Sequence, residues 1–477
     1  MHPTTLETEG EATRPGTPRH PGLVLALLAT AQLMLVLDVT VVNVALPRIG
    51  DDLGLDRGAV PWVMTAYTLV FGGLMLLGGR LADVVGPRRM ILVGLTVFTA
   101  ASLACALSGS AAELLVGRAA QGLGAAVLSP AALALLTRTS EGRGRMRALA
   151  VWGALSGAGT ALGLVLGGLL TSALGWRWIF AINVPIGVLL LAVVPFLVPA
   201  VARATSRASL DVPGAVLVTA GTGALVYGLV NAGTEGWGAA GTVLALGGGL
   251  VAWALFVLVE RATERPLLRI GLLREPPVAA GAFLMVVATG LMVGGFFLGS
   301  FMLQRAYGMS ALEVGLAFVP VAVTVVIGSQ VAGHLLVRVP AKWVASVGLA
   351  LAAIGEGLVV LIDHPAGVVT GLAVASFGAG AAFVTAFTAA LATAGQDDAG
   401  LRSAIVNTFH ELGGAFGIAA LSSVAGAALT AASPQAGDFA GAFTVAAIVV
   451  AASAAVAVVL VPSVLGSSQG HGHGHGH

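Results

Sequence analysis

Long apolar stretches separated by short polar breaks run along almost the whole chain. Each stretch is close to the roughly 20 apolar residues that a bilayer-spanning helix needs. There are fourteen of them, at residues 22–46, 60–82, 90–110, 112–136, 147–172, 178–198, 213–230, 239–259, 277–304, 311–336, 341–362, 366–394, 401–428 and 438–462. The pattern therefore predicts an all-α membrane protein with fourteen transmembrane helices.

Composition supports this class. The chain is 57% hydrophobic and only 9% charged, whereas soluble chains carry about 25% charged residues. The 67 glycines fit helices that approach one another closely in lipid. A single cysteine, Cys105, excludes an internal disulfide framework, and we expect it to serve packing.

The distribution of basic residues predicts the orientation. Eighteen Lys and Arg residues fall in loops on the side of the N-terminus, four fall on the opposite side, and Arg118 lies within a span. Basic loops stay in the cytoplasm, so we expect both termini to be cytoplasmic in a multi-pass protein of the cell (inner) membrane. No small-residue cleavage site follows the first span, and we expect that span itself to direct insertion.

An internal repeat with an offset of 254 residues is visible. Residues 79–81 (GRL) match residues 333–335 (GHL), and further matches at the same offset pair Arg88 with Lys342, Gly159 with Gly413, and Gly163 with Gly417. Two related halves with a substrate site at their interface are typical of secondary transporters. The repeat therefore predicts two six-helix halves with two further helices inserted between them.

These boundaries divide the chain into five segments. We expect a disordered cytoplasmic N-terminus at 1–21, an N-terminal six-helix half at 22–198, two inserted helices with cytoplasmic linkers at 199–276, a C-terminal six-helix half at 277–462, and a cytoplasmic His/Gly-rich tail at 463–477. Histidines alternating with flexible glycines make at most a weak metal site, and we assign the tail no transport role.

One acidic residue, Asp38, lies in the first apolar stretch, within residues 37–47 (LDVTVVNVALP). A carboxylate there costs at least about 2.5 kcal/mol on insertion scales, so it is first interpreted as functional. Burial raises the pKa of a carboxyl group and a nearby cation lowers it, which makes Asp38 the first candidate for proton coupling. Thr40 lies about 200° away on a helix, so we expect Asp38 to face a cavity or a polar partner and the other polar residues to pack against neighbouring helices.

Arg118 is the intramembrane cation of the fourth span. Gln121, at i+3, lies on the same helical face. Arginine keeps its charge in proteins and cannot release the proton itself. Its expected role is to favour the ionised form of a nearby carboxyl group, with Asp38 as the candidate; the alternative is a static ion pair that only fixes helix packing.

Two further acidic residues belong to the C-terminal half. Glu411 lies near mid-membrane in residues 407–417 (NTFHELGGAFG), next to His410, which titrates near physiological pH. The two are 100° apart on a helix and need not touch. Glu356 lies in the outer half of the eleventh span. Both suit lipophilic cations through charge pairing at low dielectric; for Glu356 the alternative is exposure in an outer vestibule.

Glycines at spacing four form a stripe along the fifth span. Such a stripe permits close helix contact. The predicted helix-packing seam consists of Gly153, Gly157, Gly159, Gly163, Gly167 and Gly168.

Four motifs resemble those of the major facilitator superfamily, in its fourteen-helix drug:proton antiporter branch. They are residues 37–47, residues 79–89 (GRLADVVGPRR), residues 118–124 (RAAQGLG) and residues 176–187 (WRWIFAINVPIG), at the helices where that branch carries them. The resemblance covers residues 22–462. The branch's span 5 motif usually has a proline four residues before its last glycine, and here Leu164 stands in its place.

The resemblance implies a major facilitator fold and roles for particular residues. It implies a role in proton or cationic-substrate binding for the span 1 motif with Asp38. Together with the residues argued from their own chemistry, the candidates for proton coupling or substrate binding are Asp38, Asn43, Arg118, Gln121, Glu356, His410 and Glu411. The resemblance also implies a conformational latch that holds the halves in the outward-facing state, formed by Gly79, Arg80, Asp83, Gly86, Arg88 and Arg89.

We therefore expect a proton-coupled exporter of hydrophobic, often cationic, small molecules such as drugs or antibiotics, working by alternating access. Its partners are the small-molecule substrate, protons and the lipid bilayer, and we expect a monomer with no cofactor, no metal and no nucleic acid. The chain has no P-loop and no nucleophile–base arrangement, so neither an ATP-driven pump nor an enzyme is expected. The first alternative is an exporter of an endogenous lipid, siderophore or secondary metabolite. The second, for which only Leu164 speaks, is an importer or a non-transporting sensor.

Overall fold

The computed structural model describes residues 21–139, 142–198, 211–263, 266–395 and 398–463. In the first half of the fifth long helix it describes the backbone but few side chains. The predicted N-terminal segment, most of the linker after residue 198 and the His/Gly-rich tail lie outside the described residues.

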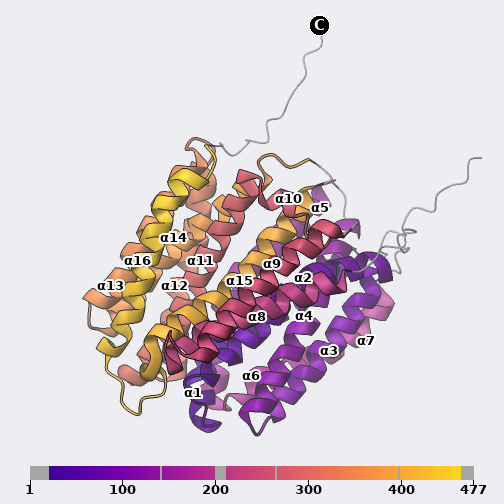
Figure 1. Ribbon diagram of the computed structural model, residues 1–477. Coiled ribbons are helices and arrows are strands. Elements are labelled where there is room, and N and C mark those ends of the chain that lie inside the picture. Colours follow the sequence, from indigo (N-terminus) through magenta and orange to yellow (C-terminus); the bar gives the residue numbers. More distant parts are fainter. Residues whose placement is uncertain (1–20, 140–141, 199–210, 264–265, 396–397, 464–477) are drawn as a thin grey trace, which may run out of the picture.

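The described residues form a bundle of helices (Figure 1). The first seven are α1 (Pro21–Asp52), α2 (Ala59–Val85), α3 (Pro87–Leu107), α4 (Ala111–Thr139), α5 (Gly142–Ala173), α6 (Arg177–Ala181) and α7 (Asn183–Leu197). The next three are α8 (Val212–Glu235), α9 (Ala240–Ala262) and the short α10 (Ile270–Leu273). The last six are α11 (Pro276–Phe301), α12 (Ala311–Leu335), α13 (Ala341–Leu361), α14 (Pro365–Leu391), α15 (Ala399–Ala425) and α16 (Ala436–Leu460).

Thirteen membrane-spanning candidates, each long and apolar enough to cross a membrane, occur among the described residues. α5, with 32 residues, is the remaining long helix, and its described part, Ala158–Ala173, is also apolar. The chain is a multi-pass helical membrane protein, as the hydrophobic pattern predicts. The predicted span 178–198 is found as one candidate span, Arg177–Leu197; a single turn residue, Ile182, whose backbone angles stay helical, divides it into α6 and α7. α11 continues in a π-helical turn over Met302–Ala306.

We call α1–α7 the N-half and α11–α16 the C-half. The repeat offset of 254 relates their helices. It carries both ends of α3 onto the ends of α13, and the start of α4 onto the start of α14. Within each half, helices pack at close range because glycines leave room for the neighbouring backbone. A Cβ added to Gly78 of α2 would overlap the Ala126 carbonyl of α4. One added to Gly378 of α14 would overlap the Gly348 carbonyl of α13.

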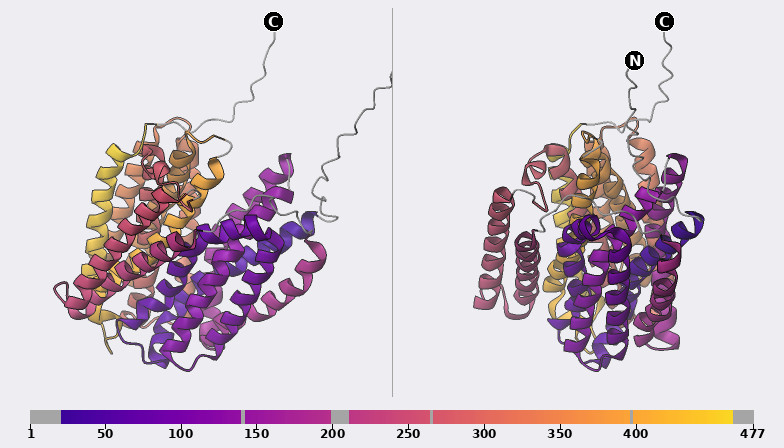
Figure 2. Two further views of the ribbon diagram at one scale, coloured as in Figure 1. Left: turned by 45° about the vertical axis from the view of Figure 1, so that its right-hand side comes forward. Right: turned by 90° about the vertical axis from the view of Figure 1, so that its right-hand side faces the viewer.

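The inserted helices α8 and α9 stand beside the bundle (Figure 2, right). α8 packs on α2 and α15, one helix from each half, and α9 packs on α8 while exposing large apolar side chains such as Leu244 and Leu250. A helix exposed in this way suits contact with lipid tails. The short helix α10 follows α9, and its buried residue Leu272 packs with Val218, Val278 and Ile405.

The two ends of the bundle differ in how the halves meet. We call the end at which α1 begins and Gly86 joins α2 to α3 the near end, and the end at residues 53–58 the far end. The ribbons of the halves lie closest at one end and diverge toward the other (Figure 2, left). Gly86 turns the chain at the near end with φ 104°, a backbone conformation that favours glycine.

Contacts between the halves gather at the far end. A Cβ on Gly168 of α5 would lie 2.5 Å from the carbonyl oxygen of Ala311, and one on Gly315 of α12 would overlap the carbonyl of Leu164. Hydrogen bonds and an ion pair join the halves there as well: Gln304 Nε2 to the Val44 carbonyl at 2.8 Å, the Leu312 amide to Ser172 Oγ at 3.1 Å, and Arg305 to Asp51. The far end is therefore closed by backbone-to-backbone packing.

Candidate functional site

A buried ion pair joins α1 to α4 inside the N-half. Arg118 Nη1 lies 2.5 Å from Asp38 Oδ2, and the side chains are 1% and 0% exposed respectively. Charges this deep in an apolar bundle need a partner, because an unpaired ion loses its hydration without compensation. The fold therefore brings together the two charged residues that the sequence placed within the first and fourth spans.

Contacts from α2 and α4 hold the Arg118 side chain in place. Its Nε donates to the Val63 carbonyl of α2 at 2.8 Å, and its Nη1 also reaches Gln121 Oε1 at 2.9 Å. The guanidinium carbon lies 4.5 Å from the centroid of the Tyr67 ring, a cation–π distance. These contacts fix the orientation of the guanidinium group toward Asp38.

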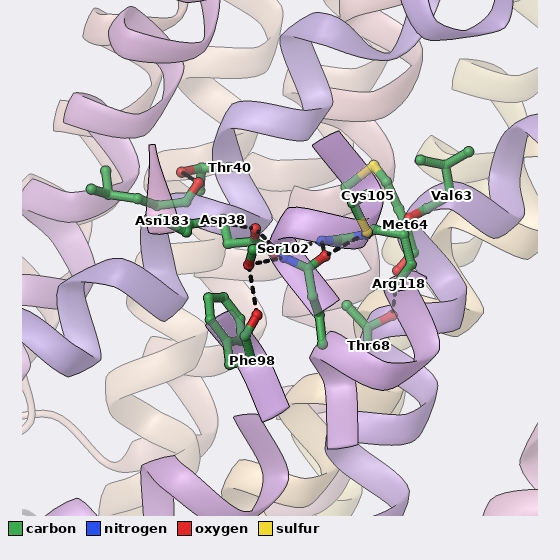
Figure 3. Close-up of polar contacts among 12 residues, drawn as sticks. Asp38, Thr40, Val63, Met64, Thr68, Phe98, Ser102, Cys105, Arg118 and Asn183 are labelled. Atoms are coloured by element: carbon green, nitrogen blue, oxygen red, sulfur yellow. Dashed lines mark hydrogen bonds and ion pairs between the residues drawn. The ribbon is translucent and has the colours of Figure 1, made fainter. Parts of the chain in front are cut away.

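Asp38 accepts two further hydrogen bonds at its other oxygen. Gln121 Nε2 and Asn183 Nδ2 both donate to Asp38 Oδ1 at 2.9 Å, and Gln121 Nε2 also donates to Ser102 Oγ at 2.8 Å (Figure 3). Side chains of α4 and α7 thus bond directly to one carboxylate on α1, and α3 joins them through the bond between Gln121 and Ser102. We call these five residues, Asp38, Ser102, Arg118, Gln121 and Asn183, the buried polar network.

Of the two surroundings expected for Asp38, the structure has polar partners and no exposed surface. Ser102 and Asn183 were not among the residues selected from the sequence. Asn183 could have been found from the sequence, because it lies within the motif at residues 176–187 and at the start of α7. No sequence signal pointed to Ser102. A hydroxyl group costs little in a span because it can donate to a carbonyl of its own helix, as Ser102 does to the Phe98 carbonyl. Asn43, five residues after Asp38, is buried and separate from the network, and its Oδ1 has no hydrogen-bond partner within the described residues.

The glycine stripe of α5 lies against α1. A Cβ on Gly159 would lie 2.9 Å from Val36 Cγ1, one on Gly167 would lie 2.7 Å from the Val41 carbonyl, and one on Gly163 would overlap the Thr40 hydroxyl. Gly168 instead faces α12 across the halves. The surroundings of Gly153 and Gly157 lie outside what the structure describes.

Replacing Gly163 by alanine is expected to destabilise the protein by about 1–3 kcal/mol, since overpacking forces helices apart. Thr40→Ala in the same chain should recover part of that loss by removing the hydroxyl. The measurement is the thermal midpoint of the detergent-purified protein. Gly247→Ala on α9, where nothing lies within 4 Å, is the control, and an equal loss in this control would contradict the packing role.

The predicted latch residues lie at the near end, and their bonds do not join one another. Asp83 pairs with Arg138 of α4 at 2.8 Å, and both side chains are solvent-accessible. Arg88 donates to the Pro195 carbonyl of α7 at 2.5 Å, and Arg80 donates to the Pro266 carbonyl before α10 at 3.1 Å. The partners of Asp83 and Arg88 belong to the N-half itself, and among the described residues neither bonds to the C-half. Gly79 is loosely packed and Arg89 is exposed.

Glu411 and His410 lie on α15 where it packs against α2. A Cβ on Gly72 of α2 would lie 2.7 Å from Glu411 Cβ. His410 Nδ1 lies 3.3 Å from Glu411 Oε1, with side-chain exposures of 37% and 16%, and the His410 ring lies 5.8 Å from that of Phe383. The two side chains therefore do touch, although their helical angle did not require it, and they remain partly accessible, unlike the buried polar network.

Glu356 is fully buried on α13, which excludes the outer vestibule as its location. It lines a small cavity with room for about one water molecule, and the other walls of this cavity are Leu291, Met292, Phe296, Val321, Leu372, Ala375 and Ser376. Neither of its carboxylate oxygens has a hydrogen-bond partner within the described residues. The C-half thus contains an acidic group without a counter-charge, whereas the N-half contains a neutralised one.

Within the described ranges, no group of three or more His, Cys, Asp or Glu side chains is arranged to hold a metal ion. What the arrangement can do is bind protons or organic cations at carboxylates and change the contacts between two halves.

Comparison with known proteins gives consistent matches. The family model described as Major Facilitator Superfamily matches residues 28–418 and 303–472. The cephamycin export protein CmcT of Amycolatopsis lactamdurans is 40% identical over 410 residues, covering 84% of both chains. The puromycin resistance protein pur8 of Streptomyces alboniger is 39% identical over 421 residues, covering 85% of this chain and 82% of the relative.

A third relative, the tetracenomycin C resistance and export protein of Streptomyces glaucescens, is 34% identical over 422 residues, covering 87% of this chain and 78% of the relative. Among solved structures, a bacterial homolog of the human lysosomal transporter Spinster matches with a TM-score of 0.68 at 16% identity. That match covers 94% of this chain and 98% of the other, and at this identity it speaks for the fold alone.

Proposed function

Because this chain belongs to the Major Facilitator Superfamily, we propose that it is a proton-coupled exporter of hydrophobic, often cationic, small molecules such as antibiotics. Several relatives are named for antibiotic export or resistance, among them the cephamycin and tetracenomycin C export proteins. The observation that carries the proposal is the placement of three acidic groups, Asp38, Glu356 and Glu411, inside the two halves of an otherwise apolar bundle. Intramembrane ionisable groups of this kind line ion and substrate pathways in transporters.

The asymmetry between the two ends supports alternating access. At the far end the halves meet through backbone contacts at Gly168 and Gly315. At the near end, as far as the structure describes the chain, Asp83 and Arg88 bond within the N-half. If the near end is cytoplasmic, as the basic loops predict, this conformation receives substrate from the cytoplasm. Rocking of the N-half against the C-half would then free the far end and allow the latch residues to engage.

The acidic groups have different roles in this mechanism. Glu411 and His410 lie at the contact between α2 and α15 and are partly accessible, so they can exchange a proton or a cation with the path between the halves. Asp38 is neutralised by Arg118 and cut off from solvent. Its expected role is to hold α1, α4 and α7 as one unit, and to take up a proton only when movement of the halves draws Arg118 away.

A second candidate function is export of a secondary metabolite made by the cell itself. The names of the cephamycin and tetracenomycin C export proteins favour it. The mechanics would be the same, but a neutral or anionic cargo would not need the acidic groups of the C-half. The remaining alternative is an importer or a sensor, and it is supported only by Leu164, which stands where the span 5 motif usually has a proline. Leu164 is buried, and its carbonyl lies against Gly315 of α12.

The test uses everted membrane vesicles and the fluorescent cation ethidium. Vesicles containing the chain are expected to accumulate ethidium when their interior is acidified, and to stop when an uncoupler dissipates the gradient. Glu411→Gln should lower the rate about tenfold, equivalent to about 1.4 kcal/mol of lost interaction. Glu235→Gln, which changes an exposed acid at the far end of α8, is the control. Accumulation that persists without a gradient would refute proton coupling, and movement in the opposite direction would support the importer.

A further inference from the structure

One of the predicted latch residues reaches outside the N-half. Arg80, close to the end of α2, donates from Nη2 to the Pro266 carbonyl at 3.1 Å, and Pro266 lies between α9 and α10. The other latch residues with described side-chain bonds, Asp83 and Arg88, bond within the N-half. In this conformation Arg80 is therefore tied to the inserted part of the chain.

The segment that accepts this bond is attached to the C-half. We call residues 266–275, which include α10, the bridging segment. At its end, Glu275 Oε2 lies 2.7 Å from Arg402 Nη2 of α15, and the Arg402 side chain is buried. Leu272, also buried, packs in one apolar cluster with Ile405 of α15. An ion pair and apolar packing thus make the bridging segment part of the C-half.

The start of the bridging segment lies at the seam between α2 and α15. The Leu268 amide donates to Glu260 Oε2 of α9 at 3.0 Å. Leu267 and Leu268 are buried, and they line the same small pocket as Leu76 of α2 and Phe409 of α15. The carbonyl acceptor directly before them therefore has a defined place next to the end of α2.

The internal repeat does not supply this contact. Its offset of 254 carries Arg80 onto His334, near the end of α12. His334 is exposed, and its Nδ1 lies 2.7 Å from the Gln330 carbonyl of its own helix. The contact of Arg80 therefore depends on the inserted helices, which bring the bridging segment to the N-half.

A bond between the two halves cannot persist unchanged when they rock. Arg80 moves with α2 and the bridging segment moves with α15, and the halves diverge toward the near end in this conformation (Figure 2, left). Hydrogen bonds from N–H to oxygen need donor–acceptor distances of about 2.7–3.2 Å, and rigid-body rotation of one half displaces its ends by more than that tolerance. A contact that exists in only one of two conformations shifts the population toward that conformation.

We propose that the bond from Arg80 to the Pro266 carbonyl favours the conformation with the open near end, and that Arg80 leaves the bridging segment before the near end closes. Arg80 is then a positioning residue that acts through the inserted helices. The latch role that the family resemblance implies has the opposite direction, because a latch would favour the closed near end. The sign of one population shift therefore distinguishes the two roles.

The proposal rests on the alternating access of the proposed function, but its test needs no transport. If Arg80→Met shifts the conformations and vesicles show no ethidium accumulation, the export function fails and the proposal stands. If accumulation is driven by the gradient and the conformations are unchanged in Arg80→Met, the export function stands and the proposal fails.

Spin labels at the near end measure the two populations in the full-length protein in lipid nanodiscs. Cysteines at Val93 of α3 and Val347 of α13, both exposed and related by the repeat offset, are introduced into Cys105→Ala. Arg80→Met removes the donor and should raise the ratio of short to long label separations about fivefold, the effect of losing one hydrogen bond. Arg261→Met changes an exposed arginine at the near end of α9 and should leave the ratio unchanged.

Further variants test whether the bridging segment carries the effect. Arg80→Lys retains a charged donor and should shift the ratio less than Arg80→Met does. Glu260→Met frees the Leu268 amide and should shift the ratio in the same direction. Glu260→Met combined with Arg80→Met should shift it no further than Arg80→Met alone, because both act through one contact.

The outcomes of these measurements decide between the two roles of Arg80. A ratio in Arg80→Met that is unchanged, or lower than in the unmodified protein, would overturn the proposal. Single shifts that add in the double variant would exclude the bridging segment as the partner. Thermal midpoints show which variants are folded, and if Glu260→Met is not, the result for Arg80→Met decides alone.

Discussion

Replacing Arg118 by methionine is expected to lower the free energy of unfolding by about 3–5 kcal/mol, because it leaves the carboxylate of Asp38 buried without its counter-charge. Asp38 is 0% exposed, so water cannot replace the lost partner. Export should be lost with folding. The measurements are the thermal midpoint of the purified protein and ethidium efflux from cells at matched expression.

The double variant Asp38→Asn, Arg118→Met separates stability from transport. It should recover most of the lost stability, since no unpaired charge remains, and it should still fail to export. Ser102→Ala removes one hydrogen bond of the same network and serves as the reference for a neutral loss; it should lower the free energy of unfolding by only about 1 kcal/mol. Full export by the double variant would show that the ion pair serves helix packing alone. If the double variant is less stable than Arg118→Met, the contribution of Asp38 and Arg118 to stability does not come from charge pairing.

The second large effect is expected at the far end, where Gly315→Leu should prevent the halves from closing. Any side chain on Gly315 meets the Leu164 carbonyl, and overpacking of this kind costs about 1–3 kcal/mol. Because that cost falls only on the conformation closed at the far end, the equilibrium between conformations should shift about 5- to 150-fold toward the open far end. Export, which needs both conformations, should fall in proportion.

Spin labels report the shift directly. Cysteines at Leu174, which directly follows α5, and at Leu316 of α12 are exposed near the far end. They would be labelled in a Cys105→Ala background, and their separation should increase in Gly315→Leu. The matched control is Gly333→Leu on the same helix, where nothing lies within 4 Å. An unchanged label distance in Gly315→Leu would mean that this contact does not limit closure.

Much of the architecture could be predicted from hydrophobicity alone. A span of apolar residues has one stable arrangement in lipid, a helix that bonds its own backbone, so position along the chain predicts the helix with little help from tertiary contacts. Hydrophobicity does not show local geometry within or between the spans. The span 178–198 contains a turn residue at Ile182, between α6 and α7, and α10 is too short to leave an apolar stretch of its own.

The candidate site could be predicted only in part. Asp38 and Arg118 were found because each is individually costly in an apolar span. Asn183 and Ser102 cost little by themselves, and their participation depends on how α7 and α3 are turned toward α1. The close approach at Gly78 was also missed, because with 67 glycines in the chain spacing alone does not say which of them face a neighbouring backbone.

The sequence by itself determined that this is a helical membrane protein with two related halves, and which residues carry charge inside it. Those features follow from the cost of placing each residue in lipid, which is local. Only the tertiary structure decided which acidic group is neutralised and which is not. Asp38 meets Arg118 across 80 positions of sequence, while Glu356 of the other half lies against apolar residues such as Leu372 and Ala375 and has no hydrogen-bond partner within the described residues. Pairing depends on helix rotation and on which helices become neighbours, and no single span contains that information.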